Sequence, residues 1–121
     1  MAKNLIQPGY KMPITPGTNI TSGQVVRQGN MLGVAETDIA SGSTGVLQIN
    51  GVFTVPKVSG AVIAAGETLT WDASAGAFDD NAATAETGDM TGDCAVAFES
   101  AGNGVTSFKV RFTGAPGEIA A

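Results

Sequence analysis

Short runs in which apolar and polar residues alternate, separated by turns rich in Gly and Pro, extend along most of the chain. The clearest run is residues 105–112, where Phe and Val side chains alternate with Lys109 and Arg111. A period of two places successive side chains on opposite faces of a β-strand. Residues 93–99 supply a partner strand, and the Asn-Gly pair at 103–104 fits the turn between them. This segment predicts an antiparallel hairpin.

One short pattern occurs twice. The spacing Ile-x-x-Gly-x-x-Val at residues 20–26 is repeated at residues 63–69, with Leu at the last position. Each copy is followed by a second apolar run, at residues 31–35 and 75–78. Because Gly adopts positive φ without strain, the pattern predicts two hairpin-like units in which a strand starts after a Gly turn. The match is short, so accidental similarity is the alternative.

Residues 45–55 also have the composition of a strand, since Val, Leu, Ile and Phe recur along them. Asn50-Gly51 in the middle fits either a two-residue hairpin turn or a bulge within one long strand. We favour the bulge, because a hairpin would leave strands of only about four residues, at the short end of the usual range. Pro56 then ends the ladder or places it at a sheet edge.

The first 17 residues contain three of the five prolines. Proline fixes φ and lacks a backbone donor, so we expect this segment to be extended and to pair only at sheet edges. The polar stretch at residues 79–93 is interpreted as a loop. The sequence therefore predicts an all-β protein, a small antiparallel β-barrel or sandwich with an extended N-terminal arm. The arm is residues 1–17, the body residues 18–114, and a short C-terminal tail residues 115–121.

The composition agrees with one β-rich domain. The 121 residues include 17 Gly and only 14% charged residues, whereas a helical bundle needs Leu, Glu and Lys at a 3.6-residue period. A net charge of −5 argues against nucleic acid as a partner, because neutralising phosphates requires clustered cations. No run approaches the roughly 20 apolar residues of a transmembrane helix, and no secretory signal is recognised. We therefore expect no membrane partner, and synthesis in the cytoplasm.

Charge is distributed unevenly along the chain. The first 35 residues contain no Asp or Glu and carry a formal charge of +3, while the remainder carries −8. Such asymmetry in a short chain suggests an arm that contacts a partner and a body that faces solvent.

Candidate chemistry is sparse. The chain has no His, so the usual catalytic base and commonest transition-metal ligand are missing. The single Cys94 lies in an apolar run and is interpreted as a buried structural thiol, because an activated thiol needs a nearby base or cation. Trp71 and the Phe residues sit at strand spacing, which indicates core packing.

The remaining motifs have better explanations than a binding site. The acids of the predicted loop lack the spacing of a compact calcium loop, so no metal is expected; they are Asp79, Asp80, Glu86, Asp89 and Asp93. A carboxylate pair for glycoside cleavage would need an aromatic pocket, yet the chain has one Trp and one Tyr. Asn19-Ile20-Thr21 fits a glycosylation site only in a secreted protein, and the Gly-rich residues 41–45 lack the Lys of a phosphate loop.

Residues 1–9, Met-Ala-Lys-Asn-Leu-Ile-Gln-Pro-Gly, closely resemble the start of the phage capsid cement (head decoration) family. Further matches follow in order along nearly the whole chain, to about Gly114, at residues 22–26, 31–35, 51–57 and 66–72. Each motif is weak alone, and it is their order, spacing and total length that are specific. The chain departs from the family in residues 79–93 and in the tail after Gly114.

The resemblance implies a non-enzymatic structural protein without a cofactor. Family members bind the outer surface of the assembled phage head and reinforce it, commonly as trimers. The implied partners are therefore the major capsid protein and, in a homotrimer, further copies of the chain, on the outside of the virion.

The N-terminal arm is the candidate contact. Its apolar side chains would anchor it, its main chain would add a strand to a neighbouring sheet, and its lysines would meet acidic capsid surface. The candidate residues are Lys3, Asn4, Leu5, Ile6, Tyr10 and Lys11. The alternative is an edge strand that packs on its own domain.

Two other functional classes fit the same strand pattern. One is a different virion or tail β-structural module. The other is a small carbohydrate- or ion-binding β module.

Overall fold

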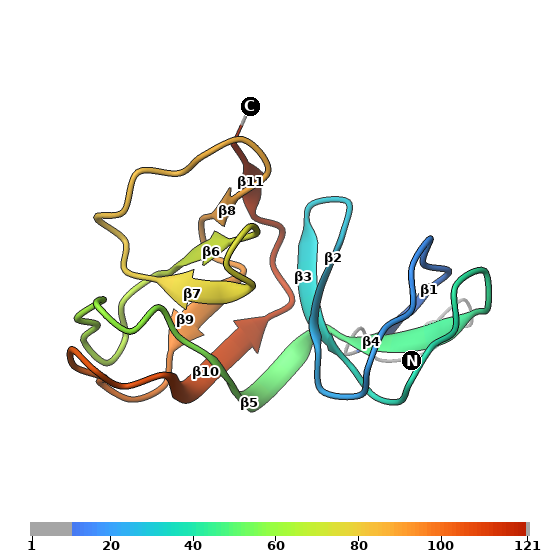
Figure 1. Ribbon diagram of the computed structural model, residues 1–121, viewed down its shortest axis with the longest axis horizontal. Helices are drawn as coiled ribbons and strands as arrows, with labels where there is room; N and C mark the ends of the chain where they lie inside the picture. Colours follow the sequence, from blue (N-terminus) through green and yellow to red (C-terminus); the bar gives the residue numbers. More distant parts are fainter. Residues whose placement is uncertain (1–10, 121) are drawn as a thin grey trace, which may run out of the picture.

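The computed structural model describes residues 11–120, and all its regular elements in this range are β-strands (Figure 1). They are β1 (Lys11–Ile14), β2 (Val25–Gln28), β3 (Met31–Ala35), β4 (Gly45–Gln48), β5 (Asn50–Pro56), β6 (Thr70–Asp72), β7 (Ala77–Asp79), β8 (Met90–Thr91), β9 (Ala95–Ala97), β10 (Ser107–Thr113) and β11 (Glu118–Ile119). Three antiparallel sheets result, in the orders β1-β4-β3-β2, β5-β10-β9 and β11-β8-β6-β7. The all-β prediction is confirmed.

The strands are arranged as two lobes, one built from β1–β4 and the other from β5–β11 (Figure 1). In the second lobe, single bridges connect the two sheets, with Lys57 parallel to Phe78 and Thr68 antiparallel to Val96. The two sheets of the second lobe are therefore joined to each other at two places, which resembles a small β-barrel.

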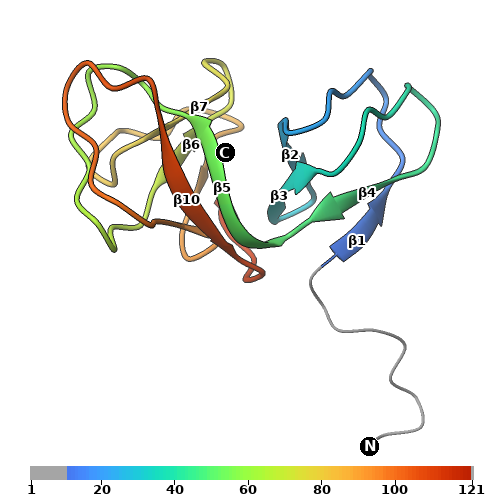
Figure 2. The ribbon, with the colours of Figure 1, turned by 90° about the horizontal axis from the view of Figure 1, so that it is seen from below.

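The chain passes from one lobe to the other along β4 and β5, which follow one another with only Ile49 between them (Figure 2). The two strands do not form a hairpin, because β4 pairs with β1 and β3 whereas β5 pairs with β10. The favoured bulge is also wrong, since β5 stays in register with β10 through Gly51 and Asn50. The chain instead bends between two sheets, next to Gly51, whose φ of 130° suits glycine.

The apolar core is continuous across the two lobes on one side of β3. Leu32 and Val34 join the large core that holds Trp71 and the buried Phe residues of the second lobe. Ala35 belongs to a smaller core within the first lobe, together with Ile14, Ile20, Ile39, Leu47 and Ile49. The β2–β3 hairpin is thus packed between two cores, which holds the lobes together.

The repeated sequence pattern is a structural repeat. Gly23 and Gly66 have φ of 84° and 85°, and each donates its N–H to a carbonyl of the strand opposite, Ala35 at 2.9 Å and Ala97 at 2.8 Å. The bridge between Ile20 and Ile39 in the first lobe corresponds to that between Ile63 and Ala101 in the second. The prediction of two hairpin-like units is confirmed, because β2 pairs with β3 and β6 pairs with β7. The glycine bonds differ in one respect, since Gly23 bonds to β3 of its own unit whereas Gly66 bonds to β9.

The hairpin predicted in the C-terminal half is present, and this half also contains two strands that the sequence did not predict. β9 and β10 pair antiparallel, with Val110 opposite Ala97. The stretch interpreted as a loop contains β8, and the segment interpreted as a tail contains β11, which pairs with β8. Gly117 also donates its N–H to the Asn30 carbonyl and accepts from the Asn30 side chain, at 2.8 and 3.2 Å, so the C-terminal segment contacts the β2–β3 turn.

Candidate functional site

Five of the six predicted contact residues lie outside the described residues: Lys3, Asn4, Leu5, Ile6 and Tyr10. The sixth, Lys11, begins β1, an edge strand paired only with β4 within its sheet. Ile14 at the other end of β1 is 4% exposed and lies in the smaller core. Lys11–Ile14 therefore pair at a sheet edge, as expected for a proline-containing segment, and they pack on their own domain.

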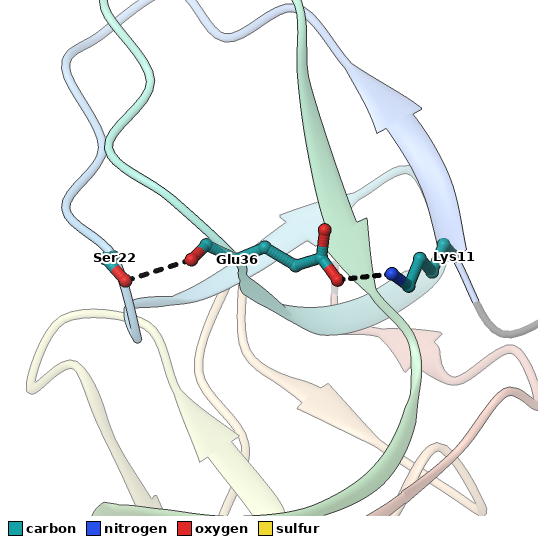
Figure 3. A network of polar contacts seen from close by, with 3 residues as sticks. All are labelled: Lys11, Ser22 and Glu36. Carbon is teal, nitrogen blue, oxygen red and sulfur yellow. Dashed lines mark hydrogen bonds and ion pairs between the residues drawn. The ribbon is translucent and has the colours of Figure 1, made fainter.

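The Lys11 side chain is fixed by an acid of the first lobe (Figure 3). Its Nζ lies 2.6 Å from Glu36 Oε1, and half of the lysine side chain is exposed. The Glu36 backbone carbonyl in turn accepts a hydrogen bond from Ser22 Oγ at 3.1 Å. An exposed ion pair of this kind contributes little to stability, typically below about 1 kcal/mol. Its effect is to orient the start of β1.

A cleft of about 500 Å³ lies between the lobes. One wall is β2 and the residues before it, including Gln24, Val26 and Arg27, and the other includes Pro56 and Trp71. β2 is the edge strand of its sheet, so this wall presents backbone groups that an extended peptide can pair with. Among the described residues that line this cleft, Arg27 is the one charged side chain.

Lys57 is a buried cation that the sequence analysis did not single out. Its side chain is 4% exposed, and Nζ donates to the backbone carbonyls of Val58 at 2.8 Å, Val105 at 3.1 Å and Ser59 at 3.4 Å. A buried ammonium group is tolerated when its donors are satisfied. Lys57 therefore joins the segment after β5 to the loop before β10, and its role is structural.

The acidic stretch is organised by Asp89. This residue is 4% exposed, and its carboxylate accepts hydrogen bonds from the backbone N–H groups of Ala73 and Glu86, both at 3.0 Å. Among residues 11–120, no group of three His, Cys, Asp or Glu side chains is placed to hold a metal ion. In the same range the structure has no helix long and apolar enough to cross a membrane.

Among the residues that the structure describes, two groups have perturbed pKa values. Burial raises the pKa of the Cys94 thiol, which is 3% exposed. The hydroxyl of Ser74 and the backbone N–H of Ala75 hold the pKa of Asp72 below its usual range. The interpretation of Cys94 as a buried thiol is confirmed.

The assignment of all aromatic side chains to the core needs one correction. Trp71, Phe78, Phe108 and Phe112 are buried, and Phe53 packs against the core. Phe98, however, is 57% exposed. It follows β9 directly and lies on the side of the sheet opposite to Ala97, so strand alternation turns it away from the core.

Comparison with known proteins agrees with a structural role. A family profile described as phage cement protein matches residues 6–112. The chain therefore belongs to the phage cement protein family, whose members are structural components of the phage capsid rather than enzymes. No curated protein matches the chain.

Proposed function

We propose that this protein binds the outer surface of the assembled phage head as a homotrimer and clamps neighbouring capsid subunits. The observation that supports a cement role is the family match over residues 6–112, which covers the first lobe and the second as far as β10. A single small domain buries too little area to hold a shell together, whereas a trimer engages several capsid subunits at once and gains from effective concentration.

The proposed contact is the N-terminal segment ending at Lys11. β1 lies at a sheet edge, and half of the Lys11 side chain is exposed, so the described end of this segment is accessible to a partner. Apolar side chains at residues 5, 6 and 10 would anchor it on the capsid, and its lysines would meet acidic groups there.

The test is co-sedimentation with undecorated heads. Removal of residues 2–10 retains β1 and Ile14, whereas removal of residues 1–17 would take away part of the smaller core. We expect the truncated protein to fold, with an unchanged circular dichroism spectrum, and to lose binding. The variant Leu5→Ser/Ile6→Ser tests the anchors, and Gln7→Ser is its matched control within the same segment. Unchanged binding by a folded truncated protein would show that this segment is not the contact.

A further inference from the structure

The outer face of the β5-β10-β9 sheet carries an unusual combination of side chains. Arg111 of β10 lies opposite Val52 of β5 on one side and Val96 of β9 on the other. Lys109 lies two residues before Arg111 in β10, and its backbone carbonyl accepts a hydrogen bond from the N–H of Phe98 at 3.0 Å. We call Val52, Val96, Phe98, Lys109 and Arg111 the basic face. Two exposed cations are here placed among three apolar side chains.

Four of the five side chains of the basic face are exposed to solvent, and Val96 is half-buried. Phe98 is 57% and Val52 42% exposed, and Lys109 and Arg111 are also exposed. Figure 2 shows β5 and β10 at the front of the second lobe. A solvated sheet face normally carries polar residues, so an exposed Phe and Val beside cations indicate a contact surface.

The charge on this face has the opposite sign to the rest of the body. From residue 36 onward the sequence has eleven acids and three cations, and one of the three, Lys57, is buried. Lys109 and Arg111 are therefore the exposed cations of this part of the chain. Glu99 borders the face, where its carboxylate accepts the backbone N–H of Lys109 at 3.1 Å.

The same chain carries a complementary surface. The connection between β7 and β8 contains the exposed Glu86 and the half-buried Asp80, and it follows the half-buried Asp79 at the end of β7. It lies on a different side of the second lobe from the β5-β10-β9 sheet (Figure 1). A cyclic trimer requires two different patches on each chain, because its contacts are head-to-tail. The basic face and the acidic connection form such a pair.

We propose that the basic face of one copy binds the acidic β7–β8 connection of the next copy. This inference rests on the proposed trimer and names the surfaces that form it. Phe98 and the two valines supply the apolar centre of the contact, while Lys109 and Arg111 select the acidic partner and fix its orientation.

The test exchanges the charges of the two surfaces by substitution. Light scattering on the full chain, over a range of protein and salt concentrations, measures how strongly the copies associate. We expect wild-type protein to associate, and Lys109→Glu/Arg111→Glu to raise the dissociation constant at least tenfold. Adding Asp80→Lys/Glu86→Lys to that variant restores association, because the exchanged charges again attract. Arg27→Glu, at an exposed cation outside the face, is the control and leaves association unchanged. Circular dichroism verifies that each variant folds.

Three results would overturn the assignment. The first is a wild-type chain that stays monomeric at every concentration and salt. The second is a Lys109→Glu/Arg111→Glu variant that associates like the wild type. The third is a Lys109→Glu/Arg111→Glu variant that still associates but no longer co-sediments with heads, because the basic face would then be a capsid contact. A wild-type chain that associates but does not bind heads would instead contradict the proposed function and leave this inference standing.

Discussion

The ammonium group of Lys57 donates a hydrogen bond to the backbone carbonyl of Val105, 3.1 Å away and 48 residues later in the chain. The same group also reaches the carbonyls of Val58 and Ser59, and the Ser59 carbonyl accepts the N–H of Gly104 at 2.7 Å. The buried ammonium group thus adds to the backbone hydrogen bonds that join these two segments, among them the bond from the Lys57 N–H to the Thr106 carbonyl at 2.8 Å.

Replacing Lys57 with Met keeps the apolar stem and removes all three hydrogen bonds. The three carbonyls lose a charged donor in a buried place, so we expect the free energy of unfolding to fall by about 2–4 kcal/mol. Urea denaturation measures this loss. Arg27→Met, at an exposed cation, is the control and should change stability by less than about 0.5 kcal/mol. A Lys57→Met protein as stable as the control would mean that the ammonium is not needed.

Gly33 in β3 has no room for a side chain. A Cβ placed there would lie 2.5 Å from the Gln48 carbonyl oxygen and 2.8 Å from Leu47 Cγ, both in β4. Gly33→Ala forces these two strands apart, and we expect a loss of about 2–3 kcal/mol in thermal or urea unfolding. Gly60→Ala is the matched control, since no atom lies within 4 Å of its Cβ position. Equal stability of the two variants would contradict the close contact between β3 and β4.

Gln24 and Glu67 occupy equivalent positions in the repeat. Gln24 Oε1 accepts the N–H of Thr21, and Glu67 Oε1 accepts the N–H of Ala64, both at 3.1 Å. Glu67 Oε2 additionally accepts the N–H of Asn81 at 3.0 Å. We expect Gln24→Ala and Glu67→Gln each to lose about 1 kcal/mol, and Glu67→Ala to lose more than Glu67→Gln. Unfolding titrations of the three variants test this order, and a Glu67→Gln variant as unstable as Glu67→Ala would refute it.

Cys94 should make the protein less stable at alkaline pH. Burial raises the pKa of its thiol in the folded state, so above about pH 8.5 the unfolded chain loses this proton more readily than the folded one. The folded state then binds more protons, and stability falls as pH rises. Cys94→Ala removes this contribution. The difference in unfolding free energy between wild type and Cys94→Ala should therefore shift in favour of the variant with rising pH, and a constant difference would count against it.

The candidate site could be predicted from the sequence only in part. Pro13 and the absence of early acids indicated an edge-pairing, positively charged N-terminal segment, and Lys11 does lie in an edge strand. The basic face was missed because Phe98 has the same strand spacing as the buried Phe108. Alternation places two side chains on opposite faces of a sheet, but it does not say which face another layer covers.

The sequence by itself determined the local geometry. The period of two along β10 and the two Ile-x-x-Gly spacings gave the strands and the positive-φ turns, because these depend on neighbouring residues alone. Only the tertiary structure decided that β4 and β5 serve different sheets, that β11 pairs with β8, and that Lys57 is buried while Phe98 is exposed. These outcomes depend on contacts between residues far apart in the chain, where the burial of apolar area outweighs local preference.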